Sequence, residues 1–321
     1  MIPLATWNLV TFTRAGAQTK LRPEKMADPL RWQTPRLVSV CPQGDLFHED
    51  VPDEFIAQVW WVMGQCAGFI PERYRGHTFL ILTKRPARMR AWLLKWADLK
   101  QRRQWIEALG ESFDWMDGPK YWPAIFPNVY LGVTAENQAM ADERIPLLLQ
   151  TPAAVRFVSC EPLLGPVDLT SIEQTVSPGY FGDCLQWYHR PIGNRATPYP
   201  TIGWVIAGGE SGPGARPLHP DWVRGLRDQC QKSGVPFLFK SWGGWQPVET
   251  SKPNTWYDFI DWDGKVGQCC RRADGTWEQD PRGPRPAILS WAQGKSAGRL
   301  LDGQTWDQYP DGLEVRMGAA S

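Results

Sequence analysis

The sequence predicts an α/β protein built on a (β/α) barrel or partial barrel of six to seven parallel strands. Short apolar runs recur along the chain, and they are nearly continuous rather than alternating, as in strands buried on both faces of a sheet. Amphipathic stretches between these runs indicate β-α units around a parallel sheet. Six or seven such units favour a closed or partly open barrel over a small doubly wound sheet.

Seven segments are expected to supply the strands. In chain order they are 5–11, 36–41, 77–86, 128–137, 154–165, 202–212 and 235–244. A helix with an acidic, proline-bearing first turn at 52–54, capped by Asp50, is expected after the second segment. Pro86 is expected to open a helix after the third, and a helix over about residues 221–232 follows the sixth.

The composition of the chain predicts three domains or subdomains. Residues 1–244 form the barrel-like domain, with an insertion at 170–201 that is rich in Pro, Gly and aromatic residues. Residues 245–290 carry Asp-Gly pairs at 263–264 and 274–275, which predict a small β-hairpin-rich subdomain. Residues 291–321 are expected to form a C-terminal helix and tail.

Charge and cysteine content limit the class of protein. With 35 basic and 34 acidic residues, the chain has no bulk basic field that would indicate nucleic acid. No apolar run approaches a membrane span and the N-terminus lacks signal-peptide features, so a cytoplasmic protein without membrane contact is expected. Seven cysteines without a signal peptide indicate reduced thiols. Some of the 19 tryptophans are expected to stack on flat rings in a site.

Polar residues follow nearly every predicted strand, at the loops that carry the chemistry of a (β/α) barrel. The candidate catalytic residues are Asp45, His48, Glu136 and Glu161. The candidate cofactor-binding or ligand-binding residues are Lys84, Arg85, Gly208, Gly209, Glu210 and Lys240.

Each candidate has a structural alternative. Lys84 and Arg85 precede a predicted helix start, which suits an anion, but they also fit a solvated loop. The glycine pair lets a backbone approach a cofactor closely. Asp45 and His48 could simply order their loop, and Lys240 ends an apolar run where a charge needs a partner or a ligand. The four histidines lack H-E-x-x-H or C-x-x-C spacing, so no metal ligand is predicted.

Several longer strings carry a resemblance to a known family. They are TWN at 6–8, DLFHEDVPDEF at 45–55, HTFLILTKRP at 77–86, VTAENQ at 133–138, ADERIPLLL at 141–149, RFVSCEPLLGPVDL at 156–169, WVIAGGESGPGARPLHPDWVR at 204–224, GVPFLFKSWG at 234–243 and GRLLDGQTW at 298–306. The sequence resembles the phage gene product thirty-seven/sixty-eight family, an uncharacterised family of phages and bacteria. The resemblance covers most of the chain.

The resemblance implies a radical S-adenosylmethionine-like enzyme. Family members follow the Trp-Asn with a three-cysteine loop that looks like the site of a four-iron, four-sulfur cluster, to which S-adenosylmethionine binds. This chain has no cysteine before Cys41, and Thr13 stands roughly where the first cysteine would fall. The cluster is therefore expected to be absent, because Cys41 and Cys160 are too few and too far apart in sequence to replace a three-thiolate loop.

Three functional hypotheses follow. The first is an enzyme-derived barrel that still binds a nucleoside or another anionic ligand at its mouth, with a nucleotide or nucleic acid as the ligand. The second is a non-catalytic accessory protein for a partner, which the resemblance implies is encoded nearby. The third is an inactive prophage remnant or a faulty gene model. The intact downstream motifs, such as TKRP at 83–86, speak against the third.

Overall fold

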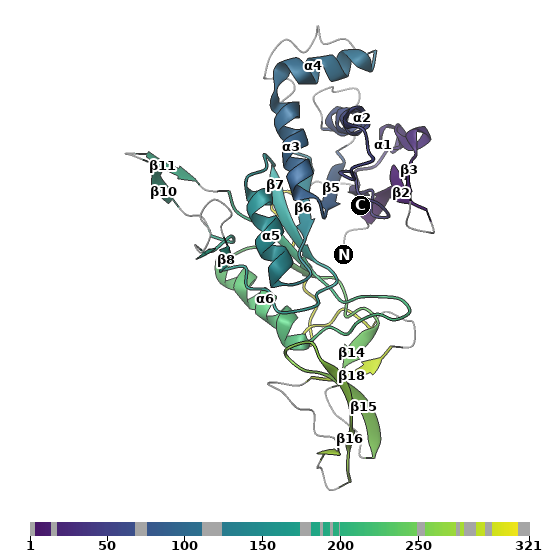
Figure 1. Ribbon diagram of the computed structural model, residues 1–321, viewed down its shortest axis with the longest axis vertical. Coiled ribbons are helices and arrows are strands. Elements are labelled where there is room, and N and C mark those ends of the chain that lie inside the picture. The colour runs from purple at the N-terminus through teal and green to yellow at the C-terminus, as the bar shows by residue number, and fades with distance from the viewer. Residues whose placement is uncertain are drawn as a thin grey trace.

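A curled sheet of seven parallel strands forms a half-barrel at the centre of the molecule (Figure 1). The computed structural model describes residues 4–13, 18–67, 76–110, 124–173, 181–186, 189–192, 195–198, 200–248, 254–273, 277–278, 287–292 and 297–313. The strands lie in the order β1 (Leu4–Trp7), β4 (Leu37–Val40), β5 (Thr78–Thr83), β6 (Val129–Thr134), β7 (Val155–Cys160), β12 (Trp204–Ala207) and β13 (Phe237–Phe239). The predicted partial barrel of parallel strands is thus confirmed, and each predicted strand segment overlaps one strand of this sheet; segment 5–11 also reaches into β2 (Val10–Phe12), which belongs to a separate hairpin.

The connecting helices begin where local chemistry favours them. They are α1 (Asp28–Arg31), α2 (Asp53–Gln65), α3 (Pro86–Ala97), α4 (Leu99–Ala108), α5 (Gln138–Leu149) and α6 (Pro220–Ser233), with a 3₁₀ turn at Pro23–Lys25. Pro86 opens α3 as expected, and the Asn137 side chain caps α5 by accepting from the backbone N–H of Met140. The expected cap of α2 is wrong: Pro52 takes the N-cap position, and the Asp50 carboxylate accepts from the Thr19 hydroxyl at 2.9 Å.

The sheet separates two apolar layers. On one face, strand residues such as Val38 and Ile81 pack with the helices in the larger core cluster. On the other face, side chains from β4, β5, β6, β7, β12 and β13 form a smaller cluster, which Leu313 completes from the C-terminal segment. Because successive residues of a strand point to opposite faces, these two layers explain why the strands read as unbroken apolar runs.

A C-terminal strap, residues 304–313, closes this second face and the free edge of β13. The backbone N–H of Phe239 donates to the carbonyl of Trp306 at 2.9 Å, and that of Gln308 donates to the carbonyl of Phe237. Leu313 is fully buried in the smaller cluster. Over residues 297–312 the expected helix is absent, and left-handed backbone at Asp302 and Gly303 fits turns instead; Leu313 is helical, and the rest of the expected segment lies outside the described residues.

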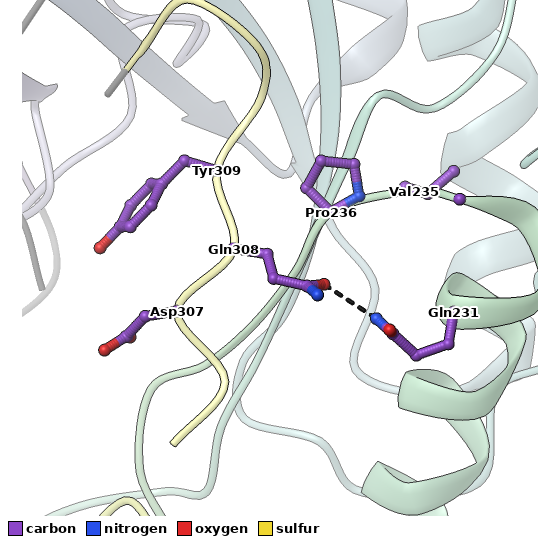
Figure 2. A pocket seen from close by; sticks show the side chains of 7 residues that line it. Gln231, Val235, Pro236, Asp307, Gln308 and Tyr309 are labelled. Carbon is purple, nitrogen blue, oxygen red and sulfur yellow. Dashed lines mark hydrogen bonds between the residues drawn. The ribbon is translucent and has the colours of Figure 1, made fainter. Parts of the chain in front are cut away.

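A hollow of about 350 Å³ lies where the strap meets the end of α6 (Figure 2). Its lining includes Gln231, Val235, Pro236, Asp307, Gln308 and Tyr309. The side-chain amide of Gln231 donates to Oε1 of Gln308 at 2.8 Å across it. The hollow opens at the amino end of β13, so it is remote from the loops at the carboxyl ends of the strands.

Smaller antiparallel sheets surround the half-barrel. The largest consists of β14 (Trp245–Pro247), β18 (Ala287–Trp291), β15 (Thr255–Ile260), β16 (Val266–Arg271) and β17 (Trp277–Glu278), and it lies at the opposite end of the molecule from α4 (Figure 1). The predicted turn at 263–264 joins β15 to β16, with Gly264 at a φ of +83°, whereas the one at 274–275 lies outside the described residues.

Three short hairpins complete the described structure. One follows β1 and consists of β2 (Val10–Phe12) and β3 (Thr19–Leu21). The other two lie within the expected insertion at 170–201: β8 (Ile172–Glu173) pairs with β9 (Phe181–Gly182), and β10 (His189–Ile192) pairs with β11 (Arg195–Pro198). Over the described residues, no helix is both long and apolar enough to cross a membrane.

Candidate functional site

Charged side chains gather at the carboxyl edge of the half-barrel. We name this group the mouth cluster, and it consists of Asp45, Lys84, Arg85, Glu136, Arg144, Glu161, Glu210, Arg216 and Lys240. All except Arg144 lie in loops after β4, β5, β6, β7, β12 and β13, which are successive strands of the sheet. The carboxyl ends of parallel strands meet at one edge, so the predicted strand-end residues are brought together.

Glu136 lies at the centre of a three-charge network. One oxygen accepts from Nζ of Lys84, and the other accepts from Nη1 of Arg144 at 2.8 Å. The side chains of Glu136 and Arg144 are each 11% exposed, whereas that of Lys84 is 54% exposed. Burial by itself raises the pKa of Glu136, but Lys84 and Arg144 outweigh it and leave that pKa below its usual range. Glu136 is therefore a carboxylate at neutral pH.

Glu161 forms a second network one strand away. Its Oε2 accepts from the Ser159 hydroxyl at 3.1 Å, and its Oε1 lies 2.9 Å from Nζ of Lys240. The Lys240 side chain is 62% exposed, so its ammonium group can be approached from solvent. The charge that ends the apolar run of β13 thus has a carboxylate partner. Gly208 lies against this pair, because a Cβ on it would come 3.1 Å from Oε1 of Glu161.

The glycine pair Gly208-Gly209 allows two loops of the chain to pack closely against each other. A Cβ on Gly209 would lie 2.0 Å from the carbonyl oxygen of Trp242, so no other residue fits there without a backbone shift. The backbone N–H of Gly209 donates to the carbonyl of Ser241 at 2.9 Å. In this structure the neighbour that Gly209 admits is therefore the loop after β13.

Glu210 completes this corner through a bidentate pair. Its two oxygens accept from Nε and Nη2 of Arg216 at 2.8 and 3.0 Å, and the backbone N–H of Arg216 adds a third hydrogen bond. Hydrogen bonding from Arg216 lowers the pKa of Glu210. The guanidinium of Arg216 is more than half exposed, so it presents a fixed positive charge at the rim.

Asp45 and Arg85 join the loops after β4 and β5. The buried Asp45 carboxylate accepts from the Thr83 hydroxyl at 2.8 Å, from the Lys84 backbone N–H at 3.2 Å and from Nη1 of Arg85 at 3.1 Å. Arg85 also pairs with Glu49. The backbone N–H of Phe47, in the same loop as Asp45, also donates to the carboxylate at 2.9 Å. The geometry therefore favours the structural role, in which Asp45 orders its own loop and ties it to the neighbouring one.

His48 lies beside the first hairpin. Its Nδ1 is 3.1 Å from the Thr19 hydroxyl, and its ring contacts Phe12 edge-on at 5.4 Å between centroids. The structure therefore brings Asp45, Glu136 and Glu161 to the sheet edge and gives His48 contacts with β2 and β3.

Sequence reasoning missed Arg144 and Ser159. Arg144 lies on α5 among buried residues such as Ala141, Ile145 and Leu148. A charged residue within the apolar face of a helix needs a counter-charge. The position of Arg144 on that face was therefore the feature of the sequence that could have identified it. Ser159 could not be identified from the sequence, because a small polar residue in an apolar strand is common and does not by itself indicate a functional site.

The residues after β1 do not fit an iron–sulfur cluster. Hairpin β2–β3 follows β1 and contacts the β4 corner so closely that a Cβ on Gly44 would lie 2.3 Å from the carbonyl oxygen of Val10. Its described side chains include threonines and no cysteine, whereas such a cluster needs thiolates. Within the described ranges, no group of three or more His, Cys, Asp or Glu is arranged to hold a metal ion.

The cysteines contribute to the core. All seven are buried and none is in a disulfide bond, and burial raises the pKa of the Cys41 thiol to about 11 and that of Cys230 to about 12. Cys160 is fully buried and its pKa is raised by the same cause. These thiols are protonated at neutral pH, which is the state that neither binds metals nor attacks electrophiles well.

Comparison with known proteins places the chain in a family. Neither the curated proteins nor the solved structures include a significant match to the chain. A family described as a protein of unknown function, DUF5131, matches residues 4–310, which is nearly the whole chain and includes every member of the mouth cluster. The chain therefore belongs to the DUF5131 family.

Proposed function

We propose that the mouth of the half-barrel binds a small ligand that carries an anionic group, with Lys84 and Lys240 as its main contacts. One observation carries this proposal: two ammonium groups, each more than half exposed, are held at the same edge by carboxylates that are largely buried. The carboxylates of Glu136 and Glu161 restrict where each ammonium group can lie. An incoming anion then meets positive charges that are already positioned, which lowers the cost of binding.

The protonation state of Glu136 and Glu210 favours binding over general-acid catalysis. A general acid must hold a proton near the working pH. The lowered pKa values of Glu136 and Glu210 point the other way, because both groups are ionised at neutral pH and already accept from cations. Their role in this proposal is to position Lys84 and Arg216.

The resemblance to the phage family suggests a ligand class. A protein that descends from radical S-adenosylmethionine-like enzymes and has lost the cluster loop would keep a nucleoside-type ligand without redox chemistry. The hairpin in place of that loop supports this loss. It equally supports an accessory role in which ligand binding controls contact with a partner protein, whereas the continuous buried core argues against a decayed remnant.

Isothermal titration calorimetry tests the proposal. The ligands are S-adenosylmethionine, adenosine monophosphate, ribose 5-phosphate and inorganic pyrophosphate. Substituting Lys84→Met or Lys240→Met should weaken binding of a ligand about 10- to 150-fold, the range for hydrogen bonds to charged groups. Lys95→Met is the matched control, because Lys95 is similarly exposed and pairs with Asp53 on α2.

Two results would overturn the proposal. One is that no ligand of this set binds the wild-type protein. The other is that a ligand binds equally well to wild type and to both mouth variants, which would place its site elsewhere.

A further inference from the structure

Three tryptophans form a row across the C-terminal sheet. Trp245 of β14 lies directly opposite Trp291 of β18, and their rings meet edge to face with centroids 5.1 Å apart. Trp256 of β15 shares their face, because Asp258 lies opposite Leu289 and side chains alternate with a period of two. Trp291 is 36% exposed and Trp256 is 53% exposed, so the row presents indole surface to solvent.

The row begins at the rim of the mouth. A Cβ on Gly244 would lie 2.6 Å from a ring carbon of Trp291 and 3.3 Å from Cβ of Ala215. The backbone N–H of Gly244 donates to the carbonyl of Glu210, and Nε1 of Trp245 donates to the carbonyl of Ala215, both at 2.7 Å. The indole of Trp291 is thereby placed next to the loop that carries Glu210 and Arg216.

The surroundings of Trp291 fix the indole as a platform. Gly244 lies against the ring and Trp245 meets it edge-on, so little rotamer freedom is left to lose when a ligand binds. Arg216 directly follows Ala215 in the chain and its side chain is 59% exposed, so a cation able to bind a phosphate lies on the loop next to Trp291. A flat ring joined to an anionic group matches this pair of features.

Building on the proposed function, we propose that Trp291 stacks on the nucleobase of a nucleotide whose phosphate contacts Arg216. Stacking on indole tolerates any base, since every base presents a π-face. The same chemistry could come from a free nucleotide or from one unit of a single strand. Trp256 distinguishes a single strand from a free nucleotide. A single strand bound at Trp291 can extend along the row and contact Trp256, whereas a mononucleotide on Trp291 cannot.

Calorimetric titration with two matched probes tests the stacking. Adenosine monophosphate carries a base and a phosphate, whereas ribose 5-phosphate lacks the base. Trp291→Ala should weaken binding of the nucleotide about 5- to 150-fold and leave that of ribose 5-phosphate unchanged. Trp291→Phe should keep most of the affinity, which guards against a folding defect. Leu94→Ala, at an exposed apolar residue on α3, is the control.

A five-nucleotide oligothymidylate distinguishes the source. If Trp256→Ala weakens binding of this strand and not that of the mononucleotide, the site takes single-stranded nucleic acid; if it weakens neither, it takes a free nucleotide. The stacking proposal fails if Trp291→Ala affects both phosphate probes equally or affects neither. If stacking fails this test but ribose 5-phosphate binds more weakly to Lys84→Met than to wild type, the proposed anion binding at the mouth is still supported. If no probe binds the wild-type protein, both the stacking proposal and the proposed function are wrong.

Discussion

Removing the carboxylate of Glu136 tests the central network of the mouth cluster. The change Glu136→Gln keeps the shape of the side chain and deletes its charge. The Arg144 side chain, which is 11% exposed, is then left without its carboxylate partner. Lys84 loses a partner too, but it is half exposed and water can solvate it. We therefore expect the cost of the substitution to come mainly from Arg144.

The structure sets the size of that cost. Breaking a buried ion pair by removing one partner costs about 3–5 kcal/mol. Arg144 keeps its hydrogen bond to the carbonyl of Thr134 at 2.8 Å, and the new amide oxygen can still accept, so we expect the lower end, about 3 kcal/mol. At about 2 °C per kcal/mol for a chain of this length, the melting temperature should fall by about 6 °C.

Differential scanning calorimetry at neutral pH measures the effect, and a second variant separates charge from packing. In Glu136→Gln/Arg144→Met neither buried charge is left, so the double variant should be more stable than Glu136→Gln alone. Glu210→Gln is the matched control: its pair with Arg216 is exposed, and its loss should cost less than about 1 kcal/mol. A single variant as stable as wild type, or a double variant no better than the single, would refute the reasoning.

The same network gives a pH dependence. The pKa of Glu136 is lower in the folded protein than in the unfolded chain, where it is about 4.3. Its contribution to stability is therefore complete above that value and is lost as the pH falls through the folded-state pKa. Thermal unfolding between pH 6 and pH 3 should show a smaller loss of stability for Glu136→Gln than for wild type. Parallel curves would contradict this assignment.

Three further predictions concern the core and the backbone. Leu313→Ala should lower the free energy of unfolding by about 2–5 kcal/mol in urea titrations, because Leu313 is fully buried in the smaller apolar cluster; a loss below about 1 kcal/mol would show that the strap does not seal this face. Gly209→Ala should prevent native folding, seen as loss of the cooperative transition, whereas Gly225→Ala in α6 has open space and should stabilise by about 0.5–1 kcal/mol. At pH 7.5 none of the seven thiols should react rapidly with a disulfide reagent until the protein is unfolded, and fast labelling of native protein would contradict the burial of these side chains.

The positions of the strands from β4 to β13 in the parallel sheet were predictable because these strands contribute to the apolar layers on both faces of the sheet. An unbroken apolar run such as FLIL in β5 is recognisable as a buried strand without knowledge of which strands lie beside it. The polar residue that ends the run marks the edge of the sheet. The candidate site followed from the same logic, since parallel strands place their ends together. Lys84, Glu136, Glu161 and Lys240 were all found in this way.

The interaction partners of the site residues were harder to predict than the positions of those residues in the fold. The pairing of Glu136 with Arg144 depends on how α5 lies over the sheet, and that is decided by packing across the whole core. The Gly208-Gly209 pair signalled a close approach, but the approaching group, the Trp242 carbonyl, lies on a different strand loop. The strap was not predicted, because its pairing with β13 leaves no local pattern in the sequence.

The strap also fixes an order of events during synthesis. Residues 306–308 leave the ribosome long after β13, so a nascent chain carries an unpaired β edge and an uncovered apolar surface around Trp204 and Leu238 until they emerge. An exposed edge of this kind pairs readily with other chains. Chains stalled or cleaved before this segment are consequently the form of the protein most prone to aggregate, and the form most in need of a chaperone.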